Sequence, residues 1–240
     1  MKAESVNNFK EFYLTDLGTF IPHKVRYFTE LNSTNHALKT HLADKQPPLI
    51  FLSDYQHQGK GRMDRVWQSP PRSGLLVSIP LITPQDLPAD SPLSIYIGWA
   101  VHQALCEFGV SNLKIKWPND LIVATKKNEK KIAGILCERS WCVSKLDKPS
   151  SPQTIVVGIG INIKKESFPA NIADKVTSIE DITGEIVDNI ALLKVVHKYL
   201  ADLIQKLANE KEAFIWQEWQ KYSLNDKWKK LAPIYTNRLY

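Results

Sequence analysis

The sequence is poor in cysteine and has no long apolar segment. Its three cysteines, Cys106, Cys137 and Cys142, show no CxxC spacing, so we expect neither a disulfide framework nor a zinc site. No run approaches the roughly 18 apolar residues of a membrane-spanning helix, and the N-terminus lacks the apolar stretch of a secretion signal. These absences predict a soluble protein with reduced thiols, located in the cytoplasm.

Charge of one sign is not concentrated anywhere in the chain. The 240 residues carry a net charge of +6, with 31 lysines and arginines against 25 acidic residues. The basic residues are scattered among acids, and the clusters at 126–131 and 227–230 are typical of solvated turns and chain ends. We therefore expect no nucleic-acid partner and no membrane partner.

The segment 55–70 combines small residues with positive charge. Its glycines, cations and large aromatic residue are Gly59, Lys60, Gly61, Arg62, Arg65 and Trp67. Apolar runs flank it, which indicates a loop between two strands. Glycine permits close backbone approach to a ligand, and lysine and arginine supply charge for a carboxylate or phosphate. The segment predicts an anion-binding loop, with a solvated basic hairpin as the alternative; it opens no helix, unlike a P-loop.

The hydrophobic pattern predicts an α+β fold in which one mixed β-sheet has helices packed on one face. Short β-branched or alternating runs predict the strands, which we place at 25–31, 49–53, 74–81, 113–117, 120–124, 131–138 and 154–163. Helical spacing of apolar residues predicts helices after the polar cluster 32–35, from 93 to 109, and from 188 to 222. Residues 1–20 are expected to form a short lead-in helix or arm.

Several residue types are unusual for the places that they occupy in these elements. Lys131 enters an apolar strand, which is costly unless the lysine meets an anion. Gly134 in the same strand, and Gly158 and Gly160 in the last strand, indicate close approach of a ligand or backbone. After Thr154 at its start, Asn162 is the one polar side chain of the last strand.

Two further groups of residues have both a structural and a functional interpretation. The sequence Ser33-Thr34-Asn35 precedes a helix, so it caps the helix or offers hydroxyls at a positively biased helix end. His102 and Cys106 are four residues apart, which is a metal-ligand spacing, but core or surface placement is favoured over a ligand pair.

Five ordered motifs resemble those of the bacterial biotin protein ligases (biotin–[acetyl-CoA-carboxylase] ligases) of the monofunctional type, which lack a DNA-binding domain. They are the S-T-N element at 33–35, the glycine-rich loop at 59–62 preceded by Gln56, KWPND at 116–120, K-x-AGIL-x-E at 131–138 and G-x-G-x-N at 158–162. The resemblance covers about residues 26–220. It implies a catalytic domain at 1–222, similar to class II aminoacyl-tRNA synthetases, and a short tail at 223–240 in which the family's SH3-like barrel is absent or vestigial.

The resemblance implies a two-step reaction with ATP, Mg²⁺ and biotin. Biotin is activated as biotinyl-5′-AMP and is then transferred to a lysine of the biotin carboxyl carrier protein of acetyl-CoA carboxylase. A homodimer of the family type is left open.

The resemblance also implies roles for individual residues. Lys131, Arg62 and Asp120 are the implied catalytic residues. The implied contacts to biotin or the adenylate come from Ser33, Thr34, Asn35, Gln56, Gly59, Lys60, Gly61, Arg62, Trp67, Lys116, Asn119, Lys131, Gly134, Gly158, Gly160 and Asn162. No residue is assigned to the metal, which is expected to arrive with the ATP phosphates.

The chain departs from the family pattern in the loop, and two alternatives follow. Lys60 replaces an arginine and so loses the bidentate fork, while Met63 and Asp64 stand where arginine or glycine is usual. One alternative is a lipoate or octanoate ligase, which shares the fold and would need an apolar tunnel in place of Ser33, Thr34 and Gln56. The other is a non-catalytic biotin-binding remnant of the ligase fold.

Overall fold

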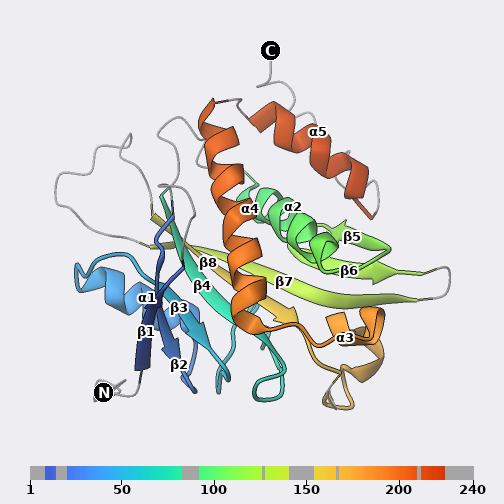
Figure 1. Cartoon of the computed structure of the whole chain (residues 1–240), viewed down its shortest axis with the longest axis horizontal. Coiled ribbons are helices and arrows are strands. Elements are labelled where there is room, and N and C mark those ends of the chain that lie inside the picture. Colours follow the sequence, from blue (N-terminus) through green and yellow to red (C-terminus); the bar gives the residue numbers. More distant parts are fainter. Residues whose placement is uncertain are drawn as a thin grey trace.

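The computed structural model describes residues 9–14, 21–82, 92–125, 128–140, 154–165, 168–209 and 212–224. One mixed sheet organises these residues (Figure 1). Its strands are β1 (Phe9–Tyr13), β2 (Lys24–Phe28), β3 (Ile50–Ser53), β4 (Gly74–Ile82), β5 (Leu113–Lys116), β6 (Asp120–Ala124), β7 (Glu129–Ser140) and β8 (Thr154–Asn162). The helices are α1 (Thr34–Ala43), α2 (Leu93–Glu107), α3 (Ile179–Thr183), α4 (Asn189–Asn209) and α5 (Glu212–Tyr222), with a 3₁₀ turn at Ala173–Lys175.

The strands follow the order β1-β2-β3-β4-β8-β7-β6-β5. Only β2 and β3 run parallel, because α1 connects them as a crossover, and the other neighbouring pairs are antiparallel. The long strands β4, β8 and β7 form the centre of the sheet. The predicted mixed sheet and α+β class are confirmed.

The first strand was not expected, because residues 1–20 were predicted to form a helix or arm. Residues Phe9–Tyr13 instead pair antiparallel with β2. Glu11 lies opposite Arg26 and also forms an ion pair with Lys24 at 2.5 Å. These cross-strand charges and the alternating sequence FKEFY favour a strand once β2 lies alongside, and the sequence of residues 9–13 alone does not show that pairing.

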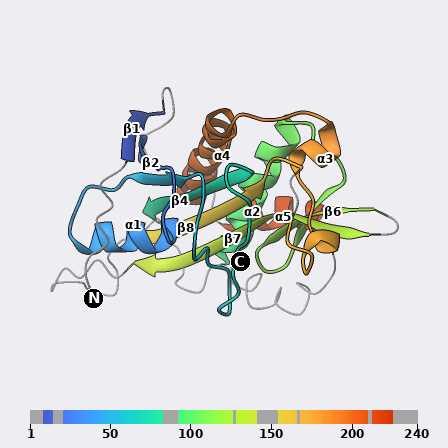
Figure 2. The same cartoon turned by 90° about the horizontal axis from the view of Figure 1, so that it is seen from below.

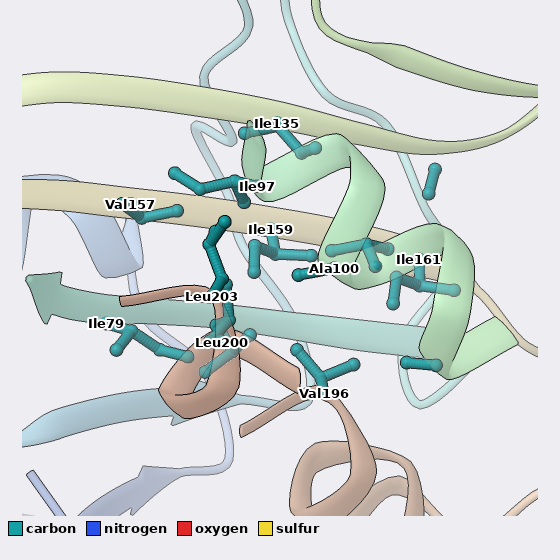
Figure 3. Close-up of a cluster of buried hydrophobic side chains, with 14 of the residues drawn as sticks. Ile79, Ile97, Ala100, Ile135, Val157, Ile159, Ile161, Val196, Leu200 and Leu203 are labelled. Carbon is teal, nitrogen blue, oxygen red and sulfur yellow. The ribbon is translucent and has the colours of Figure 1, made fainter. Parts of the chain in front are cut away.

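One face of the sheet carries the large helices. Helices α2 and α4 lie over the sheet (Figure 1). Their apolar side chains meet those of β4, β7 and β8 in the main core (Figure 3). The labelled side chains of Figure 3 come from both helices and all three strands, and include Ile97, Ile135, Ile159 and Leu200. Most of α2 is buried, since it packs against the sheet and is also contacted by α4 and α5.

The opposite face carries α1, which is an exception to the predicted one-sided arrangement (Figure 2). Leu38 and Leu42 of α1 pack on Phe28, Phe51 and Val156 in a smaller cluster. Val156 alternates with the core-facing Val157, so the two clusters lie on opposite faces. Because α1 covers only part of this face, the remainder is left for other groups.

Other expectations can be compared with the described residues. His102 is buried and hydrogen-bonds to the Leu113 carbonyl, so its core placement is confirmed, whereas Cys106 lies at the surface. No helix in the described ranges is long and apolar enough to cross a membrane. Cys142 and most of the tail, 225–240, lie outside the described residues.

Candidate active site

The first turn of α1 is tied to the segment that begins the basic loop. Ser33 is the N-cap and accepts from the His36 N–H. The Thr34 N–H donates to Gln56 Oε1 at 2.7 Å, and the Thr34 hydroxyl lies 3.1 Å from the same oxygen. The carbonyl end of Gln56 therefore faces α1, and its Nε2 group has no partner among the described residues.

A buried polar network continues from α1 across the sheet. Asn35 Nδ2 donates to Glu138 Oε2 at 2.8 Å, and Lys39 forms an ion pair with Glu138 Oε1 at 2.5 Å. Ser78 of β4 contacts both Thr34 and Asn35. Burial opposes ionisation of Glu138, but the hydrogen bonds from Lys39 and Asn35 outweigh it and keep the pKa of its carboxyl below the usual value.

The basic loop is a small hairpin that stands above the sheet. Gly61 N–H donates to the Arg65 carbonyl at 2.7 Å, and Trp67 N–H donates to the Gly59 carbonyl at 2.8 Å. The tip residues Met63 and Asp64 both have positive φ, 54° and 58°, as in the type I′ turns that close two-residue hairpins. The hairpin returns the chain so that Trp67 reaches back toward the sheet.

Trp67 lies on a surface that only glycine can provide. A Cβ at Gly160 would lie 2.6 Å from Trp67 Cε2, and one at Gly134 would lie 2.9 Å from Trp67 Cζ3 and from Lys131 Nζ. The ammonium of Lys131 lies 5.2 Å from the Trp67 ring centroid, within cation–π range. The two glycines therefore bring the loop, the sheet and the lysine together.

Lys131 points to this face because β7 contains a β-bulge. Asp120 pairs with Gly134 and Ile122 pairs with Lys131, so the register shifts by one residue. As a result, Ile132 and Ala133 both face the main core, and Lys131 lies on the same face as Gly134. Its Nζ forms an ion pair with Asp120 Oδ1 at 2.6 Å.

These elements surround a cavity of about 150 Å³ on the face that α1 leaves open. Its polar lining is given by Ser33, Thr34, Asn35, Gln56, Lys60, Arg62, Arg65, Trp67, Asn119, Asp120 and Lys131. Gly61, Gly134, Gly158 and Gly160 also line it. The cavity is smaller than the ~300 Å³ and above that is typical of ligand sites, because Trp67 lies inside it.

Three residues with a predicted binding role do not line this cavity. Gly59 lies beneath the hairpin, where a Cβ would be 2.6 Å from the Trp67 carbonyl. Lys116 forms an ion pair with Glu129 at 2.9 Å. Asn162 donates to the Thr177 carbonyl at 3.0 Å, and Thr177 N–H in turn donates to the carbonyl of Lys131. Asn162 therefore holds the segment that supports the backbone of Lys131.

Some residues of the site had no sequence signal. Val77, Ile135 and Ile159 line the cavity as ordinary apolar strand residues. Ser78 is a single serine in an apolar strand, and its hydrogen-bond partners Thr34 and Asn35 belong to α1, more than 40 residues away in the sequence. Glu138 belongs to the K-x-AGIL-x-E motif, but the motif does not indicate its contacts with Asn35 and Lys39 of α1.

The cavity favours chemistry on an anion in a partly enclosed site. Lys131 and the loop cations lie over a floor of glycines, with hydroxyl and amide groups beside them. Burial raises the pKa of the nearby Cys137 thiol to about 12, so this cysteine stays protonated and is a poor nucleophile. The described residues thus favour electrostatic stabilisation over a cysteine nucleophile.

Comparison with known proteins gives the family. A model of the biotin/lipoate A/B protein ligase family matches residues 26–162, more than half of the chain. The chain belongs to this family. Every residue of the cavity lies within the matched range.

Relatives from bacteria and eukaryotes match more than two thirds of the chain. The bifunctional ligase/repressor BirA of Bacillus subtilis is 31% identical over 172 residues, which are 70% of this chain and 50% of that protein. Human biotin–protein ligase is 31% identical over 187 residues, which are 74% of this chain and 24% of that protein. The chain spans about half the length of the bacterial BirA relatives that it matches.

Solved structures agree with the family fold. The biotin protein ligase from Aquifex aeolicus, in complex with biotin and ATP, superposes with a TM-score of 0.68 at 27% identity and covers 83% of this chain and 78% of that chain. The ligase from Leishmania major has a TM-score of 0.66 at 20% identity, covering 83% of this chain and 81% of that one, and supports the fold alone.

Proposed function

We propose that the chain is an ATP-dependent ligase that activates biotin and transfers it to a lysine of a biotin carboxyl carrier protein. In the first step a biotin carboxylate oxygen attacks the α-phosphorus of ATP and pyrophosphate leaves. In the second step the acceptor amine attacks the acyl carbon of biotinyl-5′-AMP and AMP leaves. Family membership supports both steps. The proposed location of the protein is the cytoplasm.

The observation that carries the proposal is that one cavity joins a neutral polar end to a cationic end. Gly158 lies beside Asn35, and Gly160 lies beside Trp67. Gly158 and Gly160 are two residues apart on β8, which corresponds to about 6–7 Å along the strand. The hydroxyl and amide groups of α1 therefore lie at one end of the cavity floor and Lys131 lies toward the other. This arrangement suits a ligand with a polar ring at one end and a carboxylate at the other.

Lys131 is the proposed catalytic cation. Its ammonium would contact the biotin carboxylate and then the oxygens of the α-phosphoryl group, where negative charge accumulates in the transition state. Asp120 would hold the ammonium in place until oxygens of the substrate take the place of its carboxylate beside Lys131. Arg62, with Lys60 and Arg65, would bind the phosphates as the hairpin closes and excludes water from the adenylate.

Mg²⁺ fits this site as a metal carried by ATP. Asp120 is the one carboxylate among the described lining residues, and Mg²⁺ is commonly bound by one or two carboxylates together with substrate phosphates. Asp120 and the neighbouring Asn119 are the residues that would hold it. The bound ion would offset the charge of the triphosphate.

The proposal is tested by biotin-dependent exchange of pyrophosphate into ATP. Exchange is expected with biotin and not with lipoate, and Lys131→Ala should abolish it. Lys206→Ala is the matched control, because this lysine of α4 also forms an ion pair, with Asp202 at 2.7 Å, and a cation–π contact, with Trp99, but does not line the cavity. Exchange with lipoate alone would indicate a lipoate ligase, and biotin binding without exchange would indicate a non-catalytic remnant.

The acceptor and the oligomeric state are tested separately. Incubation with a carrier-protein domain, biotin and ATP should add one biotin to its lysine, as measured by mass spectrometry. A homodimer that pairs sheets side by side is supported by β7: Ile135 still bonds to Asn119, but the edge beyond it has no β6 partner within the described residues. Sedimentation equilibrium with and without biotin measures this state.

A further inference from the structure

Ser78 joins two residues of the candidate site from beneath the cavity. It lies on β4 and has no exposed surface. Its Oγ is 2.7 Å from Thr34 Oγ1 and 2.5 Å from Asn35 Oδ1. A buried hydroxyl with two such short contacts constrains both partners.

The direction of each hydrogen bond follows from counting protons. Asn35 Nδ2 faces the Glu138 carboxylate and the Leu136 carbonyl, which are both acceptors, so the nitrogen is assigned to that side and Oδ1 faces Ser78. An amide oxygen has no proton. The single hydroxyl proton of Ser78 must therefore go to Asn35.

The hydroxyl proton of Thr34 is committed in the same way. Its two neighbours are Ser78 Oγ, which has already donated its proton, and Gln56 Oε1, which has none. Both can only accept from Thr34, so its proton stays within the protein. Toward the cavity, Thr34 Oγ1 presents lone pairs, while Gln56 presents the N–H groups of its free Nε2 end.

We propose that Ser78 is a positioning residue that makes Thr34 an obligate acceptor and so selects a ligand group that offers N–H donors beside a carbonyl. A cyclic urea has this pattern, and a dithiolane ring has neither group. The inference rests on the proposed function and adds a determinant of ring specificity to it. Ser78 does not line the cavity and acts through Thr34 and Asn35.

The test compares biotin with its cyclic carbonate analogue, in which oxygen replaces both ring N–H groups and the carbonyl is kept. Equilibrium binding to the full chain is measured by titration calorimetry. The wild-type chain should bind biotin at least about a hundredfold more tightly, because the analogue places oxygen against a lone pair. Ser78→Ala should narrow this ratio about tenfold, since the Thr34 hydroxyl then loses the nearer of its two acceptors. It keeps only Gln56 Oε1 at 3.1 Å, so turning to donate to the analogue costs less.

Two controls separate positioning from a general structural effect. Ser53→Ala removes an equally buried strand serine whose hydroxyl donates to the Tyr55 carbonyl, and it should leave the ratio unchanged. Thr34→Val and the double variant Ser78→Ala/Thr34→Val should discriminate equally, because Ser78 has no role once the Thr34 hydroxyl is absent.

Each remaining outcome has a definite meaning. A Ser78→Ala chain that binds both ligands more weakly by the same factor, or that keeps the wild-type ratio, overturns the inference and leaves the proposed function standing. A wild-type chain that binds both ligands equally overturns the acceptor assignment. A wild-type chain that does not bind biotin overturns the proposed function together with the inference.

Discussion

Lys131 Nζ and Asp120 Oδ1 lie 2.6 Å apart, although the backbones of the two residues are not opposite each other in the sheet. Asp120 pairs with Gly134, and the absence of a side chain there lets Lys131 reach across it. The ion pair therefore depends on both the β7 bulge and a glycine. It holds the ammonium at a defined position in the cavity.

Asp120→Asn should lower the pyrophosphate-exchange rate by about a hundredfold, because small misplacements of a catalytic group have effects of this size. Affinity for biotin should change by less than about threefold, since the polar end of the cavity is untouched. Calorimetry and exchange assays on the same preparation measure the two quantities. Glu129→Gln, which removes the partner of Lys116 outside the cavity, is the control. An equal loss in both variants would contradict a special role for Asp120.

Gly160→Ala should inactivate the site, because the added methyl group would overlap Trp67 at 2.6 Å. The indole would have to leave its place beside Lys131, and exchange activity should fall by at least about a hundredfold. The matched variant is Gly98→Ala in α2, where a Cβ would lie 3.4 Å from Ile115 Cγ2. That change should keep activity and stabilise the fold by about 0.5–1 kcal/mol. Equal activity in both variants would contradict the proposed packing.

Two substitutions at the hairpin tip separate a conformational effect on ATP binding from an electrostatic effect. Met63 has φ 54°, which costs a non-glycine residue about 1–2 kcal/mol and asparagine less. Met63→Asn should therefore order the hairpin and lower KM for ATP by about threefold, independently of salt. Asp64→Asn keeps a residue that tolerates positive φ and removes the negative charge. Its decrease in KM for ATP should therefore become smaller at high ionic strength. Identical salt dependence in the two variants would refute this separation.

Acid stability should depend on His102. Burial is the main cause that lowers the pKa of its imidazole to about 4, against the opposing effect of its hydrogen bond to the Leu113 carbonyl. In the unfolded chain the ordinary pKa is 6.5, so between these values the unfolded state binds the extra proton. The free energy of unfolding should then fall as the pH drops from about 6.5 to 4, by on the order of 3 kcal/mol from this residue.

Urea unfolding at a series of pH values measures the effect. His102→Gln keeps a donor for the Leu113 carbonyl and removes the titrating ring, so its stability should decline less over this range. His36→Gln changes an exposed histidine of α1 and is the control. A His102→Gln curve parallel to the wild-type curve would show that other groups cause the acid sensitivity.

The strands of the sheet could be predicted because local sequence controls them. Seven of the eight strands coincide with β-branched or alternating runs, and Pro118 separates β5 from β6 as expected. The first strand was missed, since β1 depends on charges in β2. The position of α1 was missed for a similar reason, because a short helix with an apolar side does not specify which face of a sheet it covers.

The sequence by itself determined the element types, the glycine-rich basic loop and the residues that could bind an anion, because propensity, periodicity and residue chemistry are local properties. Only the tertiary structure decided which of these residues meet. The bulge at Ile132 turned Lys131 from the core to the cavity, Asn162 took a supporting place behind it, and Ser78 joined two residues more than 40 positions away. Such contacts depend on strand register and cross-strand neighbours, which are set by the packing of the whole sheet.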